Sequence, residues 1–422
     1  MVSGTISTVV IITTLLNLTA CESSDRTATF ETLDSVKQVV NHHSESSRCD
    51  ELEQCASLRQ RNPPELDLLQ TFQSCAGNNA NFQISILTMP FSSHHDDNAH
   101  RHEPPIDTSE HTLCTGAISG GGGCHYAVTR SYLEGLSALG ANFTFNPPLS
   151  VARSSAVLWV MAGAHTLASA LQYRSTDFGG ENVLVVAGPN VEMEALAGPG
   201  VDLALFPSGW VQRLFTSKYR HLSAQSVALP AGVCTEYWKP SSSGKDKQPA
   251  RTALVYDKSL VSEASGLNHE VVGEVIAALY EAQYEVELLS YAHPGSPDGY
   301  SADQYRAALS VSRVLVWLSA SESQGIALAE AWAMDAPTVV LASASAVIDG
   351  YTVSGTSPAP YLTDATGAWL HSVEELGQVL RDIEEGRKGR GPREWVIRHM
   401  SDLAAAKMVL DVISCTLHNR TL

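Results

Sequence analysis

Basic residues are scarce in this chain. Its 422 residues include 27 Lys and Arg against 45 Asp and Glu, so the formal net charge is −18. A surface this acidic repels phosphate backbones and anionic lipid, which excludes nucleic acid as a partner class. An anionic ligand must therefore find local positive charge at a Lys, an Arg or a helix N-terminus. The length favours two domains with additional segments, and the 44% hydrophobic content is ordinary for a globular protein.

The first residues also lack basic side chains, none of which occurs between Met1 and Leu16. Val9 to Leu16 is apolar and Ala20 suits a cleavage point, so we expect a signal peptide over residues 1–20. A short membrane anchor and a bacterial lipoprotein signal ending at Cys21 are the alternatives. The expected localisation is the secretory pathway (Golgi or ER lumen) or the extracellular space, with a bacterial envelope lipoprotein as the alternative. Membrane association through the N-terminus stays open.

None of the eight cysteines has zinc-finger spacing, so disulfides are favoured over metal ligation. Cys49, Cys55 and Cys75 crowd the polar segment 21–79, which we interpret as a stem or a disulfide-tied cap. The sequons at Asn142 and Asn419 are those of a glycoprotein, although Asn142 falls in a predicted strand.

Beyond residue 79, short apolar runs alternate with helical patterns, which predicts α/β domains with parallel, doubly wound sheets. The first domain is expected over 80–238, a hydrophilic linker over 239–250, and a second domain with C-terminal helices over 251–422. Strands are predicted in the first domain at 82–89, 141–146, 156–161, 183–187, 203–206 and 226–229, and in the second at 254–256, 286–290, 314–318 and 338–341. Helices are predicted at 124–139, 166–172, 210–215, 269–282, 306–312, 326–334, 373–382 and 393–416, the last crossing back to the first domain.

Two carboxylates bracket the most informative segment. Glu322 and Glu330 enclose seven residues just after the predicted strand 314–318, with Gly325 at the turn into a helix. This places Glu330 on the helix and Glu322 at its mouth. Ionised carboxylates accept strong hydrogen bonds from vicinal hydroxyls, and amides at a helix start suit a phosphate. An isolated pair with this spacing is more often a solvated helix face, but small residues and a following buried strand favour a sugar-nucleotide site here.

A second segment, Leu229-Pro-Ala-Gly-Val-Cys-Thr-Glu-Tyr-Trp-Lys-Pro240, resembles the inter-domain signature of retaining GT-B glycosyltransferases of group 1. Glu322 to Glu330 resembles the Glu-x(7)-Glu motif of the same family. The resemblance covers roughly 183–343 and implies a GT-B fold, in which two Rossmann-like domains face a cleft, here after a polar, Cys-containing N-terminal segment.

The resemblance also implies roles for individual residues. Glu330 matches the glutamate on the ribose hydroxyls, Glu322 the one facing the donor sugar, and Lys258 the basic position on the diphosphate. Further expected donor-binding positions are Ser323, Gln324, Gly325 and Ile326, together with Gly121 and Gly122 of the glycine run 120–123.

Departures from the family pattern affect the positive charge. The usual Arg and Lys pair is reduced to Lys258, so Arg251, Arg313 or helix dipoles are candidates to share leaving-group stabilisation. Cys234 stands where the family has an aspartate. His165 is a candidate third catalytic residue beside the donor sugar, and a helix-start or core histidine is the alternative interpretation.

No bound metal is expected, because positive groups and helix N-termini stabilise the leaving group in this family. The tract His94, His95, Asp96, Asp97, His100 and His102 has metal-ligand chemistry but is more often solvated.

The sequence thus predicts a retaining hexosyltransferase that uses a nucleotide sugar, of UDP or GDP type, as co-substrate and no other cofactor. Its acceptor is a hydroxyl of a glycan, lipid or protein. A nucleotide-sugar epimerase on the same fold and a non-catalytic binding protein are the alternatives.

Overall fold

A computed structural model describes residues 82–91, 124–177, 182–240, 251–258, 269–290, 301–348 and 351–421. The expected signal peptide, the segment 21–79, the glycine run 120–123 with Gly121 and Gly122, and the His-rich tract lie outside the described residues. The chain divides into two compact units, one containing His125–Tyr237 and His399–Leu422, the other Trp238–Arg398.

The first unit is built on a six-stranded, fully parallel sheet in the order β2-β1-β3-β4-β5-β6. Apart from the half-buried edge strand β2, its apolar strands are largely buried on both faces, as expected of a parallel sheet between helices. The strands are β1 (Ile84–Leu87), β2 (Phe143–Phe145), β3 (Val157–Ala162), β4 (Leu184–Asn190), β5 (Leu203–Phe206) and β6 (Ser226–Ala228). The connecting helices are α5 (Cys124–Ala138), α6 (Leu149–Ala152), α7 (Ala164–Asp177) and α8 (Gly209–Lys218), with short 3-10 turns η2 (Met193–Leu196) and η3 (Arg220–Ala224).

The C-terminal helix α14 (Asp402–Thr421) belongs to this first unit. The helix predicted over 393–416 is in fact two, because α13 (Pro392–His399) ends before Met400. Val233 N–H donates to the Met400 carbonyl at 2.9 Å, and Val233 pairs with Ser401 in a parallel bridge. Ser401 Oγ then accepts from the Ala404 N–H at 3.2 Å, which caps the new helix.

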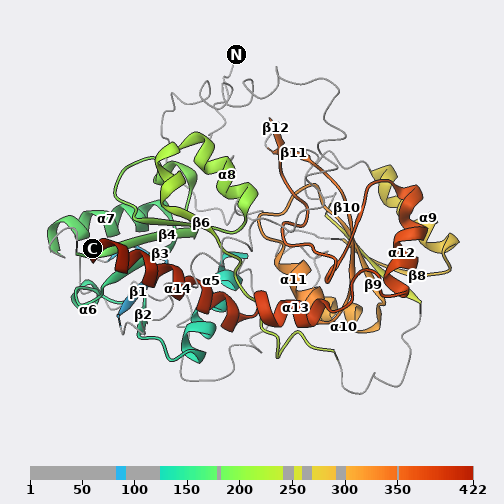
Figure 1. Cartoon of the computed structure of the whole chain (residues 1–422), viewed down its shortest axis with the longest axis horizontal. Helices are drawn as coiled ribbons and strands as arrows, with labels where there is room; N and C mark the ends of the chain where they lie inside the picture. The colour runs from blue at the N-terminus through green and yellow to red at the C-terminus, as the bar shows by residue number, and fades with distance from the viewer. Residues whose placement is uncertain are drawn as a thin grey trace, which may run out of the picture. The chain divides into compact units, whose positions relative to one another are not determined.

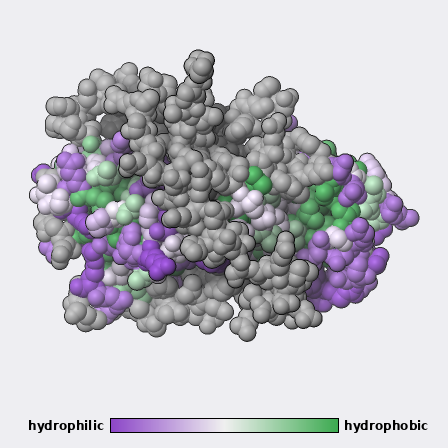
Figure 2. Space-filling view, turned by 90° about the horizontal axis from the view of Figure 1, so that it is seen from above, coloured by the Kyte–Doolittle hydropathy of each residue, from purple (hydrophilic) through white to green (hydrophobic). Residues whose placement is uncertain are grey.

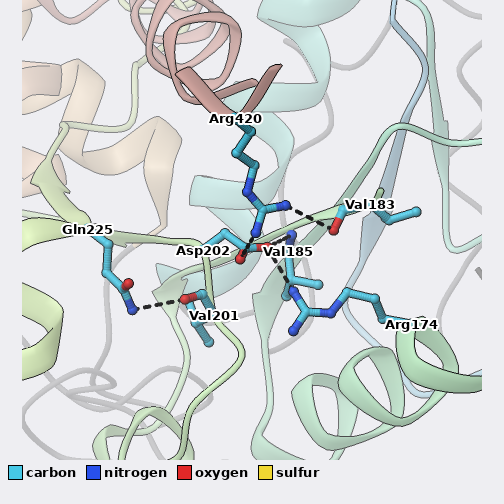
Figure 3. Close-up of polar contacts among 7 residues, drawn as sticks. All are labelled: Arg174, Val183, Val185, Val201, Asp202, Gln225 and Arg420. Atoms are coloured by element: carbon cyan, nitrogen blue, oxygen red, sulfur yellow. Dashed lines mark hydrogen bonds and ion pairs between the residues drawn. The ribbon is translucent and has the colours of Figure 1, made fainter. Parts of the chain in front are cut away.

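Asp202 fastens the far end of α14 to the sheet (Figure 3). Its carboxylate accepts from Arg420 on α14, from Arg174 on α7 at 2.9 Å, and from the Val185 N–H at 2.7 Å. Arg420 also reaches the Val183 carbonyl. One partly buried carboxylate thus ties two helices to the amino end of β4.

The second unit has a five-stranded parallel sheet in the order β13-β10-β9-β7-β8. Helices α9 and α12 pack on one face through an aliphatic cluster that includes Val275, Leu279 and Leu380 (Figure 1). Its strands are β7 (Thr252–Asp257), β8 (Glu285–Ser290), β9 (Val314–Leu318), β10 (Thr338–Leu341) and β13 (Gly367–Leu370). Its helices include α9 (His269–Glu281), α10 (Ala302–Val311), α11 (Ile326–Ala333) and α12 (Leu376–Glu384), and the 3-10 turn η6 (Val373–Glu375) precedes α12. The predicted pair of doubly wound α/β domains is confirmed.

Three strands of the second unit were not predicted. β11 (Ser345–Ile348) and β12 (Tyr351–Ser354) form an antiparallel hairpin, and β13 completes the sheet beside β10. All three strands have four residues, too few for a clear period-two pattern.

Hydrophilic residues cover most of the described surface on the face shown in Figure 2, with hydrophobic residues in smaller patches between them. In the described part of the chain, no helix combines the length and apolar character needed to cross a membrane.

Candidate functional site

The strand order of the second unit marks one place where a ligand would bind. β7 is the first strand in sequence, and its neighbours β8 and β9 lie on opposite sides of it. The connection after β7 therefore runs to one side of the sheet, toward β8, and the connection after β8 runs back across β7 to β9 on the other side. This reversal makes the gap between β7 and β9 a topological switch point. In open α/β sheets, ligands bind outside the carboxyl ends of the strands at such a switch point. The residues that follow β7 and β9 are Lys258 and Ser319.

Lys258 and Glu322 meet at this switch point. The Lys258 N–H donates to the carbonyl of Leu318, the last residue of β9, at 2.9 Å. Its Nζ donates to Glu322 Oε1 at 2.7 Å, and Ser319 Oγ donates to the same oxygen at 3.0 Å. The side chains of Lys258 and Glu322 are 12% and 5% exposed, so the pair is largely shielded from water. A buried charge is tolerated when it is paired and hydrogen-bonded in this way.

The backbone holds Glu322 in place as well. Its N–H donates to the carbonyl of Ser357 at 2.8 Å, in the loop that follows the β11–β12 hairpin. Lys258 Nζ also lies 5.7 Å from the centre of the Trp317 ring, within cation–π range. Strands β7 and β9 and the loop after the hairpin therefore all fix the Lys258–Glu322 pair.

Gly325 turns the chain from this loop into helix α11. Its φ of 83° is left-handed, a conformation that glycine adopts without steric cost. Glycine offers no side chain to cap the helix, so the first amides of α11 depend on other partners. Helix N-termini of this kind suit an anionic group.

Glu330 lies on the second turn of α11, as the sequence predicts. The residue keeps partial exposure, but protein atoms surround its carboxyl group, and this burial raises its pKa to about 8. A carboxyl group with a pKa near neutrality changes charge easily when a ligand arrives.

Arg251 and Arg313 are not part of this site, which corrects their proposed role at the leaving group. They precede β7 and β9, so they lie at the amino end of the parallel sheet. The length of β7 puts about 20 Å between that end and Lys258. Arg251 is instead engaged with Glu384 of α12 through contacts of 2.7 to 3.0 Å.

The other predicted residues fall in several places. Ser323, Gln324 and Ile326 flank Gly325 between Glu322 and the start of α11, and Gln324 is buried. His165 belongs to the first unit, where it is exposed on the first turn of α7 after β3. This matches the helix-start interpretation of His165.

Sequence reasoning missed Ser319 and Ser357 at this site. Ser319 directly follows β9, so its position at the carboxyl end of a predicted strand could have identified it. Ser357 contributes only its carbonyl, after a hairpin that the sequence did not reveal, so no residue-type signal marks it.

One group of three possible metal ligands occurs among the described residues. Ligand atoms of Glu134, Cys234 and Asp402 lie within 4.8 Å of one another, but Cys234 is disulfide-bonded, so its sulfur is not available to an ion. Burial raises the pKa of the Asp402 carboxyl to about 7, and the side chains of Ser131 and Glu134 hydrogen-bond it. Arg130 Nε donates to Glu134 at 2.6 Å. These side chains link the start of α14 to α5.

No protein-family model and no curated protein matches the chain. Among solved structures, the apo lipopolysaccharide outer core galactosyltransferase WaaB is 11% identical, with 79% of this chain and 99% of that chain covered at a TM-score of 0.48. Sucrose-phosphate synthase from Thermosynechococcus elongatus is 12% identical, with 80% of this chain and 100% of that chain covered at a TM-score of 0.48. Anabaena HepE in complex with UDP-glucose is 11% identical, with 79% of this chain and 100% of that chain covered at a TM-score of 0.45. Scores at this level do not decide function, which is inferred below from the residues and their geometry.

Proposed function

We propose that the chain is a GT-B glycosyltransferase of the retaining, group 1 type, which moves a hexose from a nucleotide sugar to an acceptor hydroxyl. The observation that carries this proposal is the Lys258–Glu322 pair at the switch point between β7 and β9, followed at once by Gly325 and the helix that bears Glu330. The Glu-x(7)-Glu spacing and the segment 229–240 support the same conclusion.

The chemistry required of the protein is mainly electrostatic. Cleavage of a glycosyl–phosphate bond builds negative charge on the departing diphosphate, which fixed positive groups stabilise. Lys258 supplies an ammonium group at this edge of the sheet, and the start of α11 supplies amides and the positive end of a helix dipole.

Glu322 plays a dual part in this scheme. In the structure it holds Lys258 by a hydrogen bond from Nζ. When a diphosphate takes up the ammonium group, the Glu322 carboxylate still accepts from Ser319 Oγ and the Glu322 N–H still donates to the Ser357 carbonyl, so the side chain can orient hydroxyls of the donor sugar. His165 remains a candidate third residue on the donor sugar.

Glu330 is assigned to the ribose hydroxyls of the nucleotide. A carboxylate accepts two hydrogen bonds from a vicinal diol, and these bonds favour the ionised form. No protein nucleophile or bound metal is invoked for this site. UDP- or GDP-linked hexoses are the proposed donors, and a hydroxyl of a glycan, lipid or protein is the proposed acceptor.

Incubation with UDP-, GDP- and ADP-linked hexoses tests the proposal. A transferase releases nucleoside diphosphate and moves the sugar to an added acceptor, with the anomeric configuration of the product read by NMR. An epimerase yields a changed free or nucleotide-linked sugar without any acceptor, and a binding protein yields neither product. Detection of no product from any donor would overturn the proposal.

The cysteines and the apolar start of the sequence support a location outside the cytosol, in the secretory pathway or at a bacterial envelope. Cys415 is a buried thiol that is not part of a disulfide. Titration of unreduced, denatured protein should therefore find one or two thiols, Cys415 among them. A count of seven or eight would overturn this placement.

A further inference from the structure

Three unsatisfied polar side chains gather at the carboxyl edge of the other sheet, in the first unit. Asn190 Nδ2, Glu192 Oε2 and Ser208 Oγ are buried atoms for which the described part of the chain supplies no hydrogen-bond partner. Ser208 is fully buried, and it precedes helix α8 without capping it. Buried polar groups are nearly always hydrogen-bonded, so three at one edge call for an explanation.

Strand register brings these residues together. Asn190 ends β4 directly opposite Ala162, the last residue of β3. Gly188 approaches β5 so closely that an added Cβ would lie 2.1 Å from the Leu205 carbonyl oxygen. Ser208 follows the end of β5, two residues after Phe206, so it continues from the strand next to Asn190.

Glu192 connects the same edge to helix α7. Burial raises the pKa of its carboxyl group, while the nearby N–H groups of Ala164, the first residue of α7, and of Glu192 itself lower that pKa. Its Oε2 atom has no hydrogen-bond partner within the described part of the chain. His165 stands next to Ala164 and interacts electrostatically with Glu192.

The unsatisfied atoms define the chemistry of a ligand. Asn190 Nδ2 is a donor, an ionised Glu192 Oε2 is an acceptor, and Ser208 Oγ can act as either. A cation would be repelled by the partial positive charge of the amide donor. An anion would be repelled by Glu192 and by Glu194, two residues further along the chain. A hydroxyl group fits, because it accepts from the amide while donating to the carboxylate.

We propose that Asn190, Glu192 and Ser208 form a carbohydrate subsite in the first unit, which binds the hydroxyls of an uncharged sugar. Binding supplies the missing partners for all three side chains. That this sugar is the acceptor rests on the proposed function; the subsite itself rests on the three unsatisfied atoms.

Saturation-transfer NMR on the full chain tests the subsite, with methyl α-glucoside, methyl α-galactoside and methyl α-mannoside as probes at millimolar concentration. Wild-type protein is expected to transfer saturation to at least one glycoside. Asn190→Ala and Glu192→Gln should weaken that binding by about tenfold, a loss of 1.4 kcal/mol. Glu192→Gln keeps the size of the side chain and one oxygen near the Ala164 N–H, and it removes the negative charge.

Glu194→Gln is the matched control. It removes a charge from the same segment, where Glu194 pairs with Lys218 at 3.5 Å, and leaves the three unsatisfied atoms untouched. Ser208→Ala provides a variant that should fold well: its melting temperature should equal or exceed that of wild type, since the lost hydroxyl has no partner, while glycoside binding weakens.

Calorimetric measurement of UDP binding separates this inference from the function proposed above. The subsite inference is overturned if no glycoside receives saturation, or if Asn190→Ala and Glu192→Gln bind glycosides as the wild type does. Glycoside binding by a chain that binds no nucleotide would leave the subsite standing and count against the transferase instead.

Discussion

The ammonium group of Lys258 lies 2.7 Å from Glu322 Oε1, and this contact joins the carboxyl ends of β7 and β9. Two residues 64 positions apart thus share one largely buried point of the second sheet. Structure and proposed chemistry both depend on this pair, so the first experiment must separate them.

A double-mutant cycle achieves this separation. Lys258→Met leaves the Glu322 carboxylate buried without its cation, and removing one partner of a buried pair costs about 3–5 kcal/mol. Glu322→Gln should cost less, and the double variant should recover much of the loss, as measured by denaturant unfolding. The double variant should still bind nucleoside diphosphate about 1.5–3 kcal/mol more weakly, because a charge-assisted hydrogen bond is gone. Unchanged affinity would remove Lys258 from the phosphate site.

Glu330 should release a proton when the nucleotide binds. Its pKa of about 8 leaves the carboxyl group mostly protonated at pH 7, and ribose hydroxyls that donate to it favour ionisation. Calorimetry of UDP binding in buffers of different ionisation enthalpy should detect on the order of one released proton. Glu330→Gln should release none, and equal release by both proteins would assign the proton elsewhere.

The same raised pKa fixes the sign of a stability effect. Between the ordinary carboxyl value and about 8, the folded chain binds more protons than the unfolded chain, so the stability that Glu330 contributes falls as pH rises through this window. Glu330→Gln should therefore raise the melting temperature relative to wild type at pH 9 and change it little at pH 4.

Gly325 is expected to tolerate no side chain. Alanine at φ 83° is strained, and its Cβ would lie 3.0 Å from Leu328 Cδ1, so Gly325→Ala should lower the free energy of unfolding by about 1–3 kcal/mol. Gly273 on α9 is the control, since nothing lies within 4 Å of an added Cβ there. Gly273→Ala should stabilise the protein by about 0.5–1 kcal/mol. Equal effects in thermal unfolding would show that backbone conformation at Gly325 is unimportant.

Asp202 should hold helix α14 on the first unit. Asp202→Ala leaves Arg420 and Arg174 without their shared carboxylate and removes the acceptor of the Val185 N–H, so we expect a loss of about 2–3 kcal/mol and faster amide exchange in α14. Asp411→Ala breaks only the exposed pair with Lys407 on the same helix and should cost under 1 kcal/mol. Unchanged exchange in both variants would show that apolar packing alone holds the helix.

The elements with strong apolar runs were predictable from the sequence, and those fixed by pairing to distant residues were not. Val314–Leu318 and the helix after Gly325 stood out because burial and periodicity are local signals. The break at Met400 was missed because its cause, pairing with Val233, lies far away along the chain.

The site shows the same division. Glu322 and Glu330 were found by their spacing and Lys258 by its place after a strand, but the 2.7 Å contact between Lys258 and Glu322 is tertiary. Arg251 and Arg313 were misplaced although both precede the predicted strands 254–256 and 314–318, an order that already puts them at the amino end of the sheet and away from Lys258. Asn190, Glu192 and Ser208 carry no motif, and only missing hydrogen bonds mark them.

Steady-state kinetics of nucleoside diphosphate release, with Glu322→Gln and Glu330→Gln compared at varied donor concentration, tests the central claim most directly. Glu330→Gln should raise the donor KM about tenfold, equivalent to 1.4 kcal/mol, with kcat little changed. Glu322→Gln should instead lower kcat at saturating donor, since a misplaced sugar loses its reactive geometry. Wild-type kinetics in both variants, with unchanged melting temperatures, would show that the two carboxylates are not part of a glycosyltransferase site.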